Sequence, residues 1–163
     1  HNAIDLDFSL KKNLSNLADS KNKKFENLRI CVLDRPRHKK IIDEAKSLNI
    51  NVKLISDGDV SGALLVTDEK HNIDLFLGTG GGPEGVLAAS ALDTYGCGFQ
   101  GRFIFDTDQL KKRANKMGIN DFDKKYELDE IIKGDSLFCA TGITKGDLLN
   151  GLELRTTKWS QVL

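Results

Sequence analysis

Leucines recur at helical spacing near the start of the chain. Leu10, Leu14 and Leu17 fall at i, i+4 and i+7, which predicts an amphipathic helix within Asp5–Lys24. Ser9 precedes the first of them and suits an N-cap, because its hydroxyl can accept a bond from a free backbone N–H. We expect the lysines of this segment to form its solvated outer face: Lys11, Lys12, Lys21, Lys23 and Lys24.

Short apolar runs then alternate with helix-spaced segments. Three runs predict buried strands: Leu28–Leu33, Ile50–Ile55 and Ile73–Leu77. Each is followed by a segment with helical spacing: His38–Leu48, Val60–Val66 and Pro83–Leu92. This β-α-β-α-β-α order at short spacing predicts a largely parallel sheet with helices on its faces.

The pattern weakens after the third helix. Further strands are predicted at Gly101–Phe105, Ser136–Ala140 and Glu153–Trp159, with a short polar helix at Asp108–Lys116 that ends before Gly118. Thr141–Asp147 would then form a loop at the carboxyl end of another strand. The whole chain is predicted to be an α/β lobe.

Three loops follow the first three strands: Asp34–His38, Ser56–Asp59 and Gly78–Gly85. Parallel strands bring their carboxyl ends to one edge of the sheet, where ligands bind in folds of this kind. We therefore expect these loops to lie together and to form a ligand site.

The third loop has four glycines in the five residues from Gly78 to Gly82, and Pro83 suits the first turn of the next helix. Such a loop lets a ligand approach the backbone, and a helix start attracts phosphate. Glu84 lies in the same first turn. It either stabilises the helix dipole or, because a carboxylate repels phosphate, holds a divalent cation between them.

Two polar motifs occupy the other loops. Arg35-Pro36-Arg37 places two guanidinium groups, which bind phosphate through paired donors, beside a helix start that disfavours cations unless an anion binds. Asp57-Gly58-Asp59 is both an ordinary turn sequence and a pair of carboxylates suited to a metal–nucleotide or to sugar hydroxyls. His38 reads as an exposed residue of a first helical turn.

A dinucleotide site is the main alternative. Gly80–Gly85 fits G-x-G-x-x-G, and Asp106 follows about 20 residues later, after a possible strand, as that fingerprint requires. Against it, Glu84 would face the pyrophosphate and the motif does not follow the first strand.

Composition limits the classes of protein to which the chain could belong. The 163 residues suit one domain, 39% are hydrophobic and the formal net charge is zero, so nothing favours nucleic acid or an anionic membrane as partner. No apolar run approaches the roughly 20 residues that span a bilayer. Cys31, Cys97 and Cys139 lack metal-ligand spacing; Cys31 and Cys139 read as reduced core thiols of a cytoplasmic protein.

Four motifs in order resemble the class II fructose-1,6-bisphosphatase family of bacteria. They are Leu-Asp-Arg-Pro-Arg-His at 33–38, Ile-Ser-Asp-Gly-Asp-Val at 55–60, Gly-Thr-Gly-Gly-Gly-Pro-Glu-Gly-Val-Leu-Ala-Ala at 78–89, and Ala-Thr-Gly-Ile-Thr-Lys-Gly-Asp-Leu-Leu at 140–149. The opening Ile4-Asp5-Leu6 and the helix with Asn13-Leu14 are also similar to that family. The resemblance covers nearly all of the chain.

The resemblance implies a layered α/β/α fold with a largely parallel or mixed sheet, of the sugar-phosphatase kind in the lithium-sensitive phosphatase superfamily. It implies metal-dependent hydrolysis of the 1-phosphate of fructose 1,6-bisphosphate, with Mn²⁺ or Mg²⁺, in gluconeogenesis. Some members also take sedoheptulose 1,7-bisphosphate. A homo-oligomer is also expected.

The resemblance also implies roles for individual residues. Glu84 matches a metal ligand, and the substrate site is implied to include Arg35, Pro36, Arg37, Asp57, Gly58, Asp59 and Gly81. The other metal carboxylates and the catalytic groups are expected in an amino-terminal half. We therefore expect residues 1–163 to be the carboxyl-terminal lobe of a two-lobe enzyme that associates with that half, and a non-catalytic sugar-phosphate sensor is a further alternative.

Overall fold

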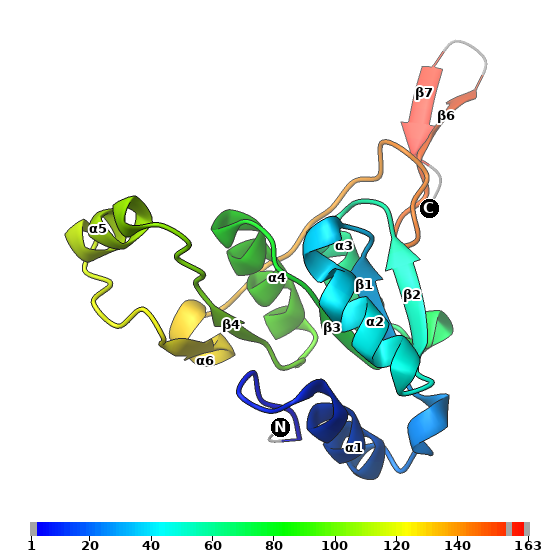
Figure 1. The fold of residues 1–163 in the computed structure, drawn as a ribbon. Coiled ribbons are helices and arrows are strands. Elements are labelled where there is room, and N and C mark those ends of the chain that lie inside the picture. The colour runs from blue at the N-terminus through cyan, green and yellow to red at the C-terminus, as the bar shows by residue number, and fades with distance from the viewer. Residues whose placement is uncertain (1–2, 156–157, 162–163) are drawn as a thin grey trace.

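The computed structural model describes residues 3–155 and 158–161, in which helices and strands are mixed (Figure 1). Its centre is a three-stranded, fully parallel sheet in the order β2-β1-β3. The strands are β1 (Arg29–Leu33), β2 (Asn51–Ile55) and β3 (Leu75–Leu77). The predicted parallel α/β arrangement is thereby confirmed.

Alternation along β1 builds two cores. Ile30 and Val32 belong to a cluster with buried residues of α1 (Leu10–Ser20) and α2 (Lys39–Ser47), whereas Cys31 and Leu33 belong to a second cluster. Successive strand side chains point to opposite faces, so both faces of β1 are covered. The Ser9 hydroxyl accepts from the Lys12 N–H at 3.2 Å, which confirms the predicted cap.

The second core continues into a helical layer. It includes Leu65 of η3 (Leu65–Thr67), which follows α3 (Asp59–Leu64) directly. α4 (Gly82–Thr94) packs on α3 through a third cluster that joins Leu64 to Ala88 and Leu92. The short helices η1 (Phe25–Asn27), η2 (Pro36–His38) and η4 (Glu69–His71) complete this part of the chain.

A smaller part extends away from the sheet, to the left in Figure 1. It contains β4 (Gln100–Arg102), α5 (Asp108–Lys116), β5 (Lys125–Glu127) and α6 (Leu128–Ile131), with β4 and β5 antiparallel. Ion pairs tie it to the start of the chain, from Lys125 to Asp5 at 2.5 Å and from Arg102 to Asp7 at 2.6 Å. The prediction of α5 was correct at both ends, but the strand predicted at Gly101–Phe105 stops at Arg102.

Predictions near the carboxyl end were partly wrong. Ser136–Ala140 forms no strand, because Phe138 packs on the α3–α4 cluster while Leu137 is 90% exposed and no strand pairs with the segment. Cys139 is exposed and therefore not a core thiol, and Thr141–Asp147 follows no strand. Glu153–Trp159 is not one strand: β6 (Leu152–Arg155) and β7 (Lys158–Gln161) form an antiparallel hairpin.

Two of the lysines predicted to be solvated, Lys21 and Lys23, instead pair with a buried carboxylate. The Asp74 side chain is 1% exposed and lies 2.7 Å from both Lys21 Nζ and Lys23 Nζ, so these lysines are not merely solvated. It also accepts from the Arg29 N–H at 3.0 Å. Burial acts to raise the pKa of Asp74, but these hydrogen bonds outweigh it and hold the pKa below its usual value.

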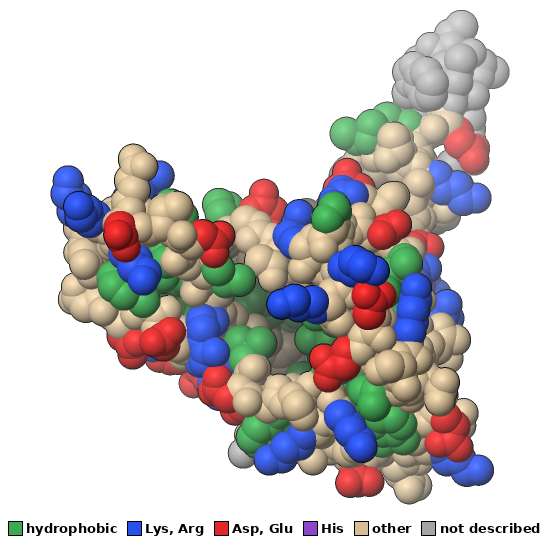
Figure 2. Space-filling view, viewed as in Figure 1, with side chains coloured by type: hydrophobic (Ala, Val, Ile, Leu, Met, Phe, Trp, Pro, Cys, Tyr) green, Lys and Arg blue, Asp and Glu red, His purple; other side chains and the backbone are tan. Residues whose placement is uncertain are grey.

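Charges of both signs are interspersed over the face drawn in Figure 2, in keeping with the zero net charge. Within the described residues, every helix is too short or too polar to cross a bilayer.

Candidate functional site at the carboxyl edge of the sheet

Strand order determines where the three predicted loops meet. β1 is central, with β2 on one side and β3 on the other, and all three run in parallel. The chain moves from β1 to β2 and then back across β1 to β3, so the topology reverses between β1 and β3. Ligands of open α/β sheets bind outside the carboxyl ends of the strands at such a reversal. The loops Asp34–His38 and Gly78–Gly85 flank it.

An ion pair joins the first loop to the second. Arg35 Nη2 lies 3.6 Å from Asp57 Oδ1, and the same oxygen accepts from the Gly58 N–H at 2.9 Å. Gly58 has φ +91°, and an added Cβ would overlap Ser61 Oγ, so only glycine fits this turn without strain. The turn places Asp57 at the loop tip, where its side chain is 93% exposed.

The first loop also holds the third. Arg37 Nε donates to the Thr79 carbonyl at 2.6 Å. His38 is fully buried, so the prediction of an exposed histidine was wrong; its ring contacts the Thr79 N–H at 2.8 Å and the Leu33 carbonyl at 2.9 Å. A buried imidazole requires partners for both nitrogens, and the end of β1 and the third loop supply them.

Contacts between the second and third loops complete the edge. A Cβ added at Gly80 would lie 3.1 Å from Asp59 Oδ2, so the Asp59 carboxylate lies against the third loop, Gly78–Gly85, which we call the glycine loop. A Cβ added at Gly81 would overlap Glu84 Oε2, which shows that Glu84 folds back over its own helix start. The absence of side chains at Gly80 and Gly81 is therefore what lets both carboxylates lie against the loop.

The edge carries donors suited to an anion. Only Nε of Arg37 is engaged among the contacts of the described residues, which leaves its terminal nitrogens available as a fork. α4 begins at Gly82 without a side-chain cap, and Pro36 opens η2 beside Arg37. Uncapped helix starts and a guanidinium fork are both favourable for phosphate.

The described residues include no group of three or more His, Cys, Asp or Glu that could hold a metal ion. Glu84 is exposed in the first turn of α4, so it fits a metal only as one ligand among several from elsewhere.

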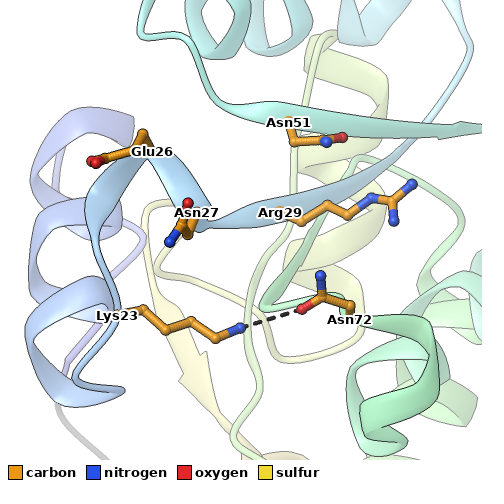
Figure 3. Close-up of a pocket in the computed structure, with 6 residues that line it drawn as sticks. All are labelled: Lys23, Glu26, Asn27, Arg29, Asn51 and Asn72. Carbon is orange, nitrogen blue, oxygen red and sulfur yellow. Dashed lines mark hydrogen bonds between the residues drawn. The ribbon is translucent and has the colours of Figure 1, made fainter.

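Two hollows accompany the sheet. One, of about 400 Å³, touches the first loop through Asp34, Arg35 and Pro36 and continues along α2. The other, of about 440 Å³, lies at the opposite, amino-terminal edge, where Lys23 bonds to Asn72 beside Arg29 (Figure 3). It is remote from the three loops, and its Lys23 is already paired with Asp74.

The dinucleotide alternative does not fit this topology. Asp106 follows β4, which pairs antiparallel with β5 and is not part of the sheet that contains β3. A dinucleotide site requires the acidic residue at the end of the next parallel strand. Glu84 also stands in the first turn of α4, where its carboxylate would repel a pyrophosphate unless a cation lay between them.

His38 and Thr79 are the contacts that the sequence analysis missed. A signal for His38 was present, since it stands four residues before Ile42 and seven before Ala45, both buried on α2. That spacing puts it on the inward side of the helix start. Nothing in the sequence singles out Thr79 among its glycines.

Comparisons with known proteins show the family of the chain. Residues 1–161 match the family described as bacterial fructose-1,6-bisphosphatase, glpX-encoded. Three relatives carry the name D-fructose 1,6-bisphosphatase class 2/sedoheptulose 1,7-bisphosphatase. The protein of Synechocystis sp. is 39% identical to this chain, and the aligned part covers 91% of this chain and 47% of the relative. The protein of Microcystis aeruginosa is 38% identical, with 91% of this chain and 47% of the relative covered. The protein of Trichodesmium erythraeum is 38% identical, with 93% of this chain and 48% of the relative covered.

The chain thus spans about half the length of the curated relatives that it matches. The match includes the first, second and third loops, whose contacts with one another are described above. By its sequence, this chain belongs to the glpX-encoded bacterial fructose-1,6-bisphosphatase family.

Proposed function

We propose that this chain forms the sugar-phosphate-binding lobe of a fructose-1,6-bisphosphatase. In the reaction, water adds to phosphorus and the bond between phosphorus and the sugar O1 breaks, with a proton of the water passing to O1. The products are inorganic phosphate and fructose 6-phosphate for gluconeogenesis. The observation that carries the proposal is the meeting of three loops at one sheet edge, with the Arg37 fork and an uncapped helix start side by side.

The loops suggest a division of labour. Arg35 and Arg37 would bind a phosphate of the substrate, because a guanidinium fork matches phosphate oxygens. Asp57 and Asp59 would accept hydrogen bonds from sugar hydroxyls, with Gly58 fixing the turn between them. The name of the relatives also includes sedoheptulose 1,7-bisphosphatase, so the same loops would also accept a longer sugar.

We propose Glu84 as a ligand of Mn²⁺ or Mg²⁺. Its exposed carboxylate beside a phosphate-binding loop suits a hard cation, and substrate oxygens and other protein carboxylates would provide the remaining ligands. Such a cation, when bound, would supply charge neutralisation and water activation. Glu84 itself would orient the cation, and Gly81 would leave room for that carboxylate.

The partner would be the amino-terminal half that the resemblance implies. α4 supports this, because it is apolar around most of its circumference: Ala88 and Leu92 are buried, yet Val86 and Leu87 are 49% and 56% exposed. A helix of that kind is normally covered on all sides. Leu87→Glu should abolish association with the other half, whereas Leu110→Glu on α5 should not; equal binding would contradict this.

Two wider proposals accompany it. A cytoplasmic location is supported by the free thiols of Cys31, Cys97 and Cys139. The homo-oligomer stays a prediction, which sedimentation velocity would measure.

Phosphate release tests the proposed reaction. The chain would be mixed with the amino-terminal half of the Synechocystis relative, fructose 1,6-bisphosphate and Mn²⁺, and the sugar product identified. We expect phosphate and fructose 6-phosphate, a loss of release with Glu84→Gln, and no loss with Glu69→Gln, a matched exposed carboxylate. Release that survives Glu84→Gln would remove the metal role, and no release from the mixture would contradict the activity.

A further inference from the structure

The imidazole of His38 is the most deeply buried polar group at the loop edge. It is 0% exposed, although its neighbours Arg37 and Lys39 on either side are exposed. A polar ring is buried at such a place only if its hydrogen bonds are satisfied.

The partners of the ring fix its tautomer. His38 Nδ1 lies 2.9 Å from the Leu33 carbonyl, which can only accept, so Nδ1 carries the hydrogen. Nε2 is then an acceptor: the Thr79 N–H donates to it at 2.8 Å, and the Thr79 carbonyl, 3.2 Å from Nε2, receives no hydrogen from the ring. The neutral ring thus connects the last residue of β1 to the middle of the glycine loop.

The glycine loop depends on this connection. Among the described residues, the side-chain hydrogen bonds to Gly78–Gly81 all reach Thr79, from His38 and from Arg37. Glycines cost more conformational entropy to order than other residues, so a loop with so few anchors is ordered mainly by those it has.

We propose that His38 is a positioning residue that latches the glycine loop to the sheet edge through the Thr79 amide. The latch sets the direction in which the loop amides and the start of α4 face an incoming phosphate. The effect of this latch on ligand binding rests on the proposed function, whereas the hydrogen bond from the Thr79 amide to His38 does not.

Two substitutions separate the two ends of the ring. In His38→Gln the amide oxygen can reach the place of Nε2 and accept from Thr79. In His38→Asn the shorter amide can donate to Leu33 in place of Nδ1 but leaves Thr79 without an acceptor. Both variants put an amide in the same buried site, so a merely structural role predicts the same loss from each.

Nuclear magnetic resonance reads the latch without any ligand. In the wild-type chain we expect a protonated Nδ1, an unprotonated Nε2 and a Thr79 amide protected from hydrogen exchange. Protection should persist in His38→Gln and be lost in His38→Asn. A protonated Nε2 in the wild type, or equal Thr79 exchange in the two variants, would overturn the proposal.

Calorimetric titration with fructose 1,6-bisphosphate and Mn²⁺ then measures the consequence. Losing one hydrogen bond costs about 0.5–1.5 kcal/mol, so His38→Asn should bind about 2- to 12-fold more weakly, with His38→Gln closer to wild type. His71→Gln, in η4 away from the three loops, is the control and should bind as wild type. Equal affinity of the Asn and Gln variants would overturn the positioning role, whereas no binding by the wild type would contradict only the proposed function.

Discussion

Asp74→Asn tests the link between the sheet and the glycine loop. Asp74 stands one residue before β3, and it bonds to the start of β1 in both directions: its N–H donates to the Arg29 carbonyl at 2.8 Å, and its carboxylate accepts from the Arg29 N–H at 3.0 Å. The substitution keeps the size of the side chain and removes its charge. It therefore weakens the contact between the start of β1 and the start of β3, the strand that leads into the glycine loop.

The structure sets the expected loss. Breaking one partner of a buried ion pair costs about 3–5 kcal/mol when the remaining charge stays buried. Here Lys21 and Lys23 are 40% and 34% exposed, so water can take over much of their solvation. We expect a loss of about 1.5–3 kcal/mol in the free energy of unfolding, the range of hydrogen bonds to charged groups.

Urea unfolding followed by circular dichroism measures this difference. Asp43→Asn is the matched control, because Asp43 pairs with Lys39 at 2.9 Å across one helical turn with both side chains more than half exposed. Such a pair contributes about 0.3–0.5 kcal/mol. A loss in Asp74→Asn no larger than in the control would refute the reasoning.

The same pair of proteins gives a pH test. The folded-state pKa of Asp74 is lowered, so its contribution is fully present above the unfolded value of about 3.9 and is lost as pH falls through the folded value. The stability difference between wild type and Asp74→Asn should stay constant from pH 7 to about pH 5 and shrink in stronger acid. A difference that grows on acidification would contradict the assignment.

Three further predictions concern the site and the core. Glu84→Gln should weaken Mn²⁺ binding to the chain with its sugar bisphosphate at least about 10-fold in calorimetry, while unfolding changes by less than about 1 kcal/mol, the range of a helix-dipole contact; unchanged Mn²⁺ affinity would remove the ligand role. Gly58→Ala should cost about 1–2 kcal/mol in urea unfolding because of its positive φ, unlike Gly98→Ala, which meets nothing within 4 Å; equal stabilities would refute the strain. Burial raises the pKa of Cys31 to about 11, so iodoacetamide followed by mass spectrometry should label the exposed Cys139 first; equal rates would contradict the burial.

Local patterns were sufficient for the parallel core. The run Arg-Ile-Cys-Val-Leu forms β1, and both of its faces are covered by apolar residues of other elements. Thr107 caps the start of α5, and Gly118 follows its end with a positive φ. Such features depend on neighbours in sequence, so spacing reveals them.

Long-range contacts were not predictable in the same way. Ser136–Ala140 has the composition of a strand, but a strand requires a free sheet edge, which no local pattern reports. Asp74 was hidden inside an apolar run, and its two lysine partners lie more than 50 residues away.

The candidate site shows the same division. The motifs predicted which loops would meet, because parallel strands must bring their carboxyl ends together. The contacts that hold the loops, Arg35 to Asp57 and His38 to Thr79, depend on which strands are neighbours. Strand order is a property of the whole fold, and the sequence alone left it open.

A calorimetric titration of the chain tests the central claim, which is that the carboxyl edge binds a sugar bisphosphate. Fructose 1,6-bisphosphate with Mn²⁺ and, separately, NAD would be added to the wild type and to Arg37→Ala, with Arg113→Ala on α5 as the control. We predict binding of the bisphosphate and not of NAD, weakened about 10-fold or more by Arg37→Ala and unchanged by Arg113→Ala. Binding of NAD alone, or of the bisphosphate with equal affinity in Arg37→Ala, would contradict the account.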